Sequence, residues 1–167
     1  MGLNDYRGPP IMIFASPSLN RTPRERLAAQ INVARDLALH GSAGPARTVC
    51  GSVFLEHLPI LARDGELLGS YVECLLVLEM MALLPRVVQA IHGVSLDIVP
   101  LSDRLAGPGG RRWKLNFGTG VSLPMSSPGR LERVQSAQRW SRIILAEAAR
   151  EPDATESVAG RVLEPAI

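Results

Sequence analysis

The chain has 167 residues, a length that suits a single domain. Hydrophobic residues make up 46% and charged residues 20%, so a core can form and the composition argues against global disorder. The formal net charge of +2 points to no particular partner, and an aromatic content of 4% predicts an aliphatic core.

The cysteines and the most apolar segment bear on the compartment. Cys50 and Cys74 lack the spacing of a metal or redox motif and lie in apolar runs, so we expect both to be buried and reduced, as in a cytoplasmic protein. The most apolar stretch, residues 67–84, contains Glu73 and Glu79, which argues against a membrane span. The N-terminal residues also lack the pattern of a secretion signal.

The start of the chain predicts an arm, a strand and a loop. Residues 1–10 are polar and end in Gly-Pro-Pro, which predicts an extended arm. Residues 11–15 (IMIFA) are apolar without alternation, which is typical of a strand buried on both faces of a parallel sheet. Residues 16–21 (SPSLNR) are rich in turn formers and predict a loop.

The clearest helix begins after Thr22. Thr22 and Glu25 form a capping-box pattern, with Pro23 at the first helical position. Gly41 stands where a left-handed residue would end the helix. Between these ends, apolar residues recur at helical spacing: Leu27, Ile31, Ala34 and Ala38.

Residues 46–55 and 64–84 are each expected to contain a strand, and the second segment also fits a purely helical structure. Residues 46–55 predict a strand broken near Gly51. Residues 64–84 are apolar on nearly every side, so their periodicity fits two structures. We expect a short helix followed by a buried strand over residues 74–78 (CLLVL), whereas the alternative is one helix kinked at Pro85.

The second half of the chain predicts a helix and two strands. Residues 81–91 predict a helix that ends at Gly93. Residues 94–101 and 112–117 alternate between apolar and polar side chains, as strands with one buried face do. Residues 118–129 are rich in Gly, Ser and Pro and predict a loop.

The last segments complete the expected organisation. A final helix is expected from Ser127 to about Arg150, and residues 151–167 predict a flexible tail. Between the arm and this tail, residues 11–150 are expected to form a single domain. Its predicted fold class is α/β, a small three-layer domain with a short, mainly parallel sheet, a β-hairpin extension and a C-terminal helix.

The loop after the first strand is the candidate ligand site. Ligands of parallel sheets bind at the carboxyl ends of the strands, and the amino end of the following helix attracts anions. The polar side chains at this place are Ser16, Ser18, Asn20, Arg21 and Thr22. We expect them to hold a phosphate or a ribose, and the alternative is an ordinary turn whose polar side chains cap the helix.

Basic residues are concentrated in the second half. Residues 101–142 carry 8 basic and 2 acidic side chains, whereas the first 100 residues carry 8 basic and 9 acidic ones. Arg111, Arg112 and Lys114 are therefore candidates for contact with nucleic acid or another partner. Stacking on a base is disfavoured because Trp113 alternates to the other face of the strand, and a solvated basic face is the alternative.

The residues that commonly carry catalysis form no established motif. His40, His57 and His92 lie apart, without acidic or cysteine partners at ligand spacing, so we expect neither a metal nor a cofactor. Glu73 and Glu79 lie in an apolar run, where a buried carboxyl is harder to ionise and suits acid–base chemistry. The alternative is that both reach solvent. We assign no catalytic residue, and the sequence leaves open whether the protein is an enzyme.

Three segments in the first half follow one another in a recognisable order. The first is a strand that ends in a small residue and proline (IMIFASP), and the second is a helix rich in Arg, Asn and Ala over residues 24–41. The third, residues 65–79, is an acidic-led helix that runs into an apolar segment. In this order, residues 11–100 resemble the nucleoside 2-deoxyribosyltransferase-like group of small α/β proteins.

The resemblance implies an α/β fold but not the transferase reaction. Leu75 stands where the group has an aspartate, and Pro85 stands where it has a glycine. Gln89 replaces the nucleophilic glutamate, and an amide cannot attack the anomeric carbon as a carboxylate does.

These features lead to two functional hypotheses. The first is a binding protein for a nucleotide-like or phosphorylated small molecule at residues 16–22. The alternative is a structural or assembly protein, such as a viral or phage-type subunit, that contacts partners or nucleic acid through residues 101–142. A homo-oligomer is compatible with either hypothesis.

Overall fold

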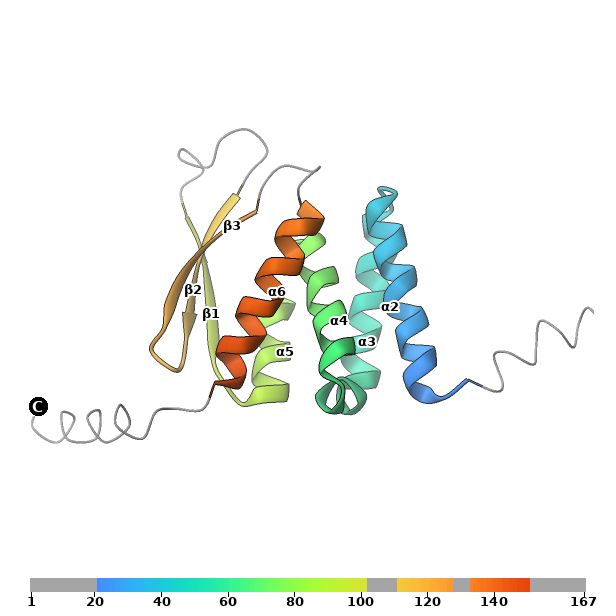
Figure 1. Ribbon diagram of the computed structural model, residues 1–167. Coiled ribbons are helices and arrows are strands. Elements are labelled where there is room, and N and C mark those ends of the chain that lie inside the picture. Colours follow the sequence, from blue (N-terminus) through green and yellow to red (C-terminus); the bar gives the residue numbers. More distant parts are fainter. Residues whose placement is uncertain (1–20, 102–110, 128–132, 151–167) are drawn as a thin grey trace, which may run out of the picture. The chain divides into compact units, whose positions relative to one another are not determined.

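The computed structural model describes residues 21–101, 111–127 and 133–150 (Figure 1). The chain divides between Cys74 and Leu75 into two compact units. The described part before this boundary is called the N-terminal unit, and the described part after it is called the C-terminal unit.

The N-terminal unit is helical. It contains α2 (Pro23–Leu39), α3 (Ala43–Arg63) and the greater part of α4 (Gly65–Val77), and α2 packs against α3. The hydroxyl of Tyr71 on α4 is fully buried and donates a hydrogen bond of 2.7 Å to the carbonyl of Cys50 on α3. The buried side chains of this unit include Leu27, Ile31, Ala34, Ala46, Val53, Leu61 and Val72.

Helix α2 confirms the prediction made from its two ends. The Thr22 side chain caps the first turn together with Glu25, and Pro23 begins the helix. At the other end, Gly41 takes φ +85°, and the N–H of Ser42 donates to the carbonyl of Leu37 at 2.8 Å. This is the glycine-terminated pattern that the sequence indicates.

The segment expected as a strand over residues 46–55 belongs to helix α3, so that prediction is wrong. Cys50 and Val53 are buried at helical spacing. Gly51 does not break the element, because a single glycine costs a helix only about 1 kcal/mol and the burial of Cys50 and Val53 outweighs it. Pro45 lies in the first turn, where the missing N–H has no helical partner to lose, so it is compatible with the helix start.

The strand expected over residues 74–78 is also wrong, because α4 continues to Val77. Tyr71, Leu75 and Leu78 are buried at helical spacing, but so are their neighbours, and this makes the pattern ambiguous. The alternative of one long helix is wrong as well, since α4 ends before α5 (Leu83–His92) begins.

The C-terminal unit combines two helices with a small sheet. Its strands β1 (Leu96–Pro100), β2 (Arg111–Phe117) and β3 (Ser122–Ser127) pair in the order β1-β2-β3, and both pairs are antiparallel. Helix α5 contacts β1 and α6 (Arg133–Ala149), and α6 also contacts β3 (Figure 1).

Side chains of the sheet alternate between two faces. Trp113, Leu115 and Phe117 of β2 are buried, and Met125 of β3, the partner of Trp113 in the register, is buried with them. Strand β3 lies in a segment expected to be a loop. It tolerates Pro124 because an edge strand has N–H groups that need no partner in the sheet.

The predicted fold class is wrong. The described residues form five helices and three antiparallel strands, so they are mostly helical and contain no parallel pair of strands. Four predicted elements are confirmed. The segments 81–91, 94–101, 112–117 and 127–150 correspond to α5, β1, β2 and α6, with ends that agree to within a few residues except at the start of α6. Residues 11–15, the expected first strand, lie outside the described residues.

Candidate ligand-binding pocket

The loop predicted to bind a ligand is described only at its end. Ser16, Ser18 and Asn20 lie outside the described residues, and Arg21 is exposed. The hydroxyl of Thr22 accepts the N–H of Glu25 at 3.1 Å and donates to the Glu25 carboxylate at 3.0 Å. Both functions of this hydroxyl are therefore used by the cap, and a ligand site at residues 16–22 stays a prediction.

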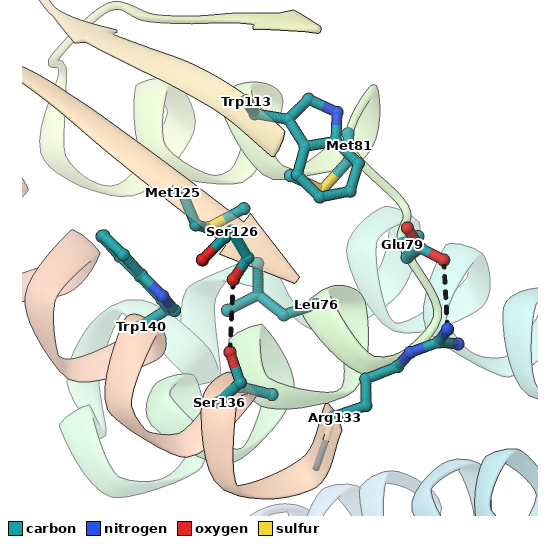
Figure 2. Close-up of a pocket in the computed structure, with 10 residues that line it drawn as sticks. Leu76, Glu79, Met81, Trp113, Met125, Ser126, Arg133, Ser136 and Trp140 are labelled. Atoms are coloured by element: carbon teal, nitrogen blue, oxygen red, sulfur yellow. Dashed lines mark hydrogen bonds and ion pairs between the residues drawn. The ribbon is translucent and has the colours of Figure 1, made fainter. Parts of the chain in front are cut away.

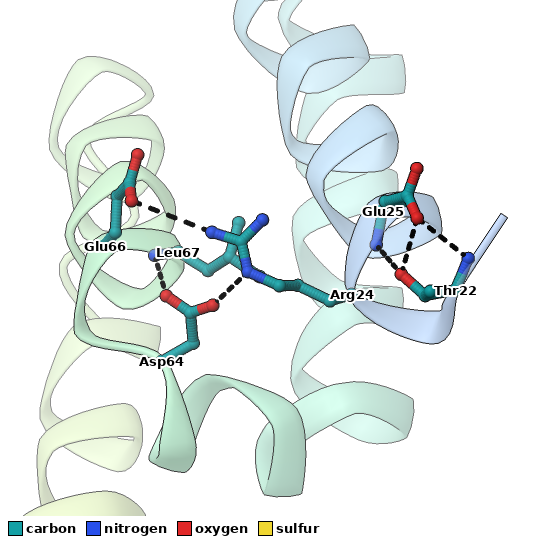
Figure 3. Close-up of polar contacts among 6 residues, drawn as sticks. All are labelled: Thr22, Arg24, Glu25, Asp64, Glu66 and Leu67. Atoms are coloured by element: carbon teal, nitrogen blue, oxygen red, sulfur yellow. Dashed lines mark hydrogen bonds and ion pairs between the residues drawn. The ribbon is translucent and has the colours of Figure 1, made fainter.

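A second polar cluster joins the start of α2 to the start of α4 (Figure 3). Asp64 accepts the N–H of Leu67 at 3.1 Å, which caps α4, and its other oxygen accepts a hydrogen bond from Nε of Arg24. The hydrogen bond from Leu67 and then the one from Arg24 hold the pKa of Asp64 below its ordinary value of 3.8. Arg24 is thus committed to a structural pair rather than to a phosphate.

The three basic residues proposed as a partner site do not share one face. Strand alternation turns Arg112 and Lys114 to the face opposite the buried Trp113. Arg111 stands at the start of β2 and points its Nε toward Glu79, with 3.8 Å between Nε and Oε2. The structure therefore separates Arg111 from the other two and joins it to a pocket.

This pocket lies within the C-terminal unit and holds about 270 Å³ of empty space that is partly open to solvent (Figure 2). Trp113 and Trp140, the only tryptophans of the chain, both line it. The other side chains that matter here are Glu79, Met81, Met125 and Arg133. The pocket thus combines flat apolar walls with a carboxylate and a guanidinium.

The backbone at the end of α4 places Glu79 in the pocket. The N–H of Met80 donates to the carbonyl of Leu75 at 2.8 Å, and the N–H of Glu79 donates to that of Leu76 at 3.1 Å. This pattern favours a left-handed glycine, yet Glu79 adopts φ +54°, and it is the only non-glycine residue with positive φ among those described. A left-handed backbone costs roughly 1–2 kcal/mol for a residue with a side chain.

The polar atoms of the pocket are close together but incompletely paired. The Glu79 carboxylate lies 3.7 Å from Nη2 of Arg133 and 3.8 Å from Nε of Arg111, beyond normal hydrogen-bond distances. Glu79 Oε2, Arg133 Nε and Trp140 Nε1 are buried without any hydrogen-bond partner. Of the four such side-chain atoms among the described residues, only His92 Nε2 belongs to a residue that does not line the pocket.

Sequence reasoning singled out one pocket residue, Glu79, as a carboxylate in an apolar run. Glu73 was singled out for the same reason, but it lies beside Arg35 in the N-terminal unit, with 3.9 Å between the charged atoms. Arg133 and Trp140 were missed, because helical spacing alone does not say which side chain of α6 faces a pocket. The sequence offers one signal for this site: each of the two tryptophans of an aromatic-poor chain has basic residues next to it in the sequence.

In comparisons with known proteins, no protein-family model, no curated protein and no solved structure matches the chain. The resemblance to the deoxyribosyltransferase-like group therefore stays a prediction. Within the described part of the chain, no helix is long and apolar enough to cross a membrane. No three His, Cys, Asp or Glu side chains in that same part are placed to hold a metal ion.

The lowered pKa of Asp64 predicts a loss of stability in acid. Its folded-state pKa lies below the unfolded value, so its contribution is present above about pH 4 and is lost as the pH falls through the folded pKa. In Asp64→Asn the amide still caps α4 but does not titrate in this range. We expect wild type to be the more stable of the two near pH 7, with a difference that shrinks toward pH 2. Urea denaturation across this range measures it, and a constant difference would contradict the assignment.

The strained backbone of Glu79 predicts a difference between two substitutions. Glu79→Gly and Glu79→Ala both remove the carboxylate, but only glycine adopts the left-handed conformation without strain. We expect the glycine variant to have the higher free energy of unfolding, by about 1 kcal/mol. Urea unfolding followed by circular dichroism measures the difference, and equal stabilities would show that this backbone is relaxed in solution.

Proposed function

We propose that the protein binds a small molecule in the pocket of the C-terminal unit. The observation that carries the proposal is the gathering of three unpartnered buried polar atoms, from Glu79, Arg133 and Trp140, in one partly open pocket. A buried polar group without a partner destabilises a protein by about 1–3 kcal/mol. A ligand that supplies the missing hydrogen bonds recovers this free energy on binding.

The backbone of Glu79 supports the same conclusion. A glycine would end α4 without strain, whereas glutamate requires φ +54° and leaves its buried Oε2 without a hydrogen bond, 3.8 Å from Nε of Arg111. Residues held in a strained backbone conformation tend to cluster at functional sites. We therefore attribute the presence of this carboxylate to recognition rather than to stability.

Binding is favoured over catalysis by the groups at hand. Among the described lining residues, Ser126 and Ser136 are the hydroxyl bearers, and Ser136 donates at 3.4 Å to the backbone carbonyl of Ser126. No histidine, cysteine or lysine is present among these lining residues to activate either hydroxyl, and the Glu79 carboxylate forms no hydrogen bond with them. The expectation of a small-molecule ligand is kept, and its place is proposed here rather than at residues 16–22.

The two tryptophans make binding directly measurable. Because both line the pocket, the intrinsic fluorescence of the whole protein reports on its occupancy. We expect some members of a fragment library to change this fluorescence saturably and to raise the melting temperature. Arg133→Ala should weaken binding by tenfold or more, since a charged hydrogen-bond donor contributes about 1.5–3 kcal/mol. Arg142→Ala makes the same change at an exposed position of α6 that does not line the pocket and serves as a folded control. A library with no saturable response would refute the proposal.

A second candidate function rests on charge. The described residues of the C-terminal unit carry 8 basic and 3 acidic side chains, whereas those of the N-terminal unit carry 6 of each. Arg112 and Lys114 share the face of β2 opposite Trp113, and neither forms an ion pair with a residue that the structure describes. This face is suited to phosphate groups of nucleic acid, although Trp113 is turned away from it and cannot stack.

Salt dependence tests this second candidate. If Arg112 and Lys114 contact phosphates, DNA binding should weaken with salt, and removing both should lower the slope of log K against log salt by about 2. Arg139→Ala with Arg142→Ala removes the same charge from α6 and should leave the slope nearly unchanged. A larger effect of the α6 pair than of the β2 pair would refute this assignment.

A further inference from the structure

The pocket has a charged end formed by Glu79 and Arg133, and its geometry limits what can bind there. Figure 2 shows the Glu79 carboxylate facing the Arg133 guanidinium. The two are 3.7 Å apart, whereas a charge-assisted hydrogen bond is about 2.7–2.9 Å long. Each therefore has hydrogen-bonding capacity that its neighbour does not use, namely Oε2 of Glu79 as an acceptor and Nε–H of Arg133 as a donor.

From this arrangement we infer that the ligand bears a neutral, planar head group with a hydrogen-bond donor beside an acceptor, as in a carboxamide or an amino-substituted nitrogen heterocycle. The inference rests on the proposed function and specifies its ligand. Such a group donates to Glu79 and accepts from Arg133 at the same time. Carboxylates and phosphates offer only acceptors, and an ammonium group offers only donors, so neither satisfies both atoms.

Charge leads to the same selection. An anionic head lies beside the Glu79 carboxylate, and a cationic head lies beside the Arg133 guanidinium, so each meets a like charge. Arg111 adds a second positive charge, but its side chain is 67% exposed, against 28% for Arg133 and 19% for Glu79. Solvent therefore screens Arg111 the most, and the opposed pair of Glu79 and Arg133 dominates the local field.

The rest of the pocket suits a flat apolar body. Trp113 and Trp140 supply ring surfaces, and Met81 and Met125 supply adaptable apolar contacts. Figure 2 shows Trp140 on the opposite side of the pocket from Arg133, and its indole N–H has no partner.

Three probes with one ring and three heads test the inference. Nicotinamide has a neutral carboxamide, nicotinate a carboxylate and 3-(aminomethyl)pyridine an ammonium group at neutral pH. Titrations of the full-length protein followed by tryptophan fluorescence should give nicotinamide a dissociation constant at least about tenfold below those of the other two. Tighter binding of nicotinate or of the amine would overturn the inference in favour of an anionic or a cationic head.

A variant of Glu79 links this preference to the proposed residue. Glu79→Gln keeps the size of the side chain but adds an N–H donor and removes the charge, so the preference for nicotinamide over nicotinate should fall about tenfold. Asp97→Asn makes the same change at an exposed position on β1 and should leave the preference intact. An unchanged preference in Glu79→Gln would overturn the inference.

The fragment screen distinguishes an error in the inferred head group from an error in the proposed binding function. If other fragments change the fluorescence while nicotinamide and its analogues do not, the inferred head group is wrong and the binding function stands. If no compound of any kind changes the fluorescence, both the inference and the proposed function are wrong.

Discussion

The left-handed turn at Glu79 is the constraint on which the pocket depends. Helix α4 ends with carbonyls of Leu75 and Leu76 that need donors, and the N–H groups of Met80 and Glu79 supply them only if the chain turns with positive φ. This turn fixes the direction in which the Glu79 side chain leaves the backbone. The position of the carboxylate is therefore set by helix termination, and the arginines of β2 and α6 meet it there.

Elements with a local signal could be predicted from the sequence. The ends of α2 are specified by Thr22, Glu25 and Gly41, whose interactions involve residues only a few positions away. The strand β2 is specified by alternation, because one of its faces is buried. For α2 the cause lies within the segment itself, and for β2 the alternation marks within the segment which face will be buried, so neither element needs knowledge of the rest of the fold.

Elements whose signal depends on their surroundings could not be predicted. The run that forms the end of α4 is buried on nearly every side, so neither a period of 2 nor one of 3.6 stands out. Pro124 favours a loop in the sequence, and it is compatible with a strand only because β3 lies at the edge of the sheet. The pocket is harder still, because Glu79, Trp113 and Arg133 come from three separate segments. Sequence identifies Glu79 as unusual, but only the fold brings the other two to it.

In the binding function that we propose, affinity and selectivity would come from different residues of the pocket. Contact with Trp113 and Trp140 scales with apolar area and accepts many flat molecules, so it discriminates weakly. Buried groups that await a hydrogen bond discriminate strongly, because a ligand that leaves Glu79 or Arg133 unpaired loses free energy rather than merely failing to gain it. The strain at Glu79 then has a physical rationale: it keeps a carboxylate within reach of Arg133. A glycine at this turn would leave the donors of Arg133 and Trp140 but remove the acceptor that faces them.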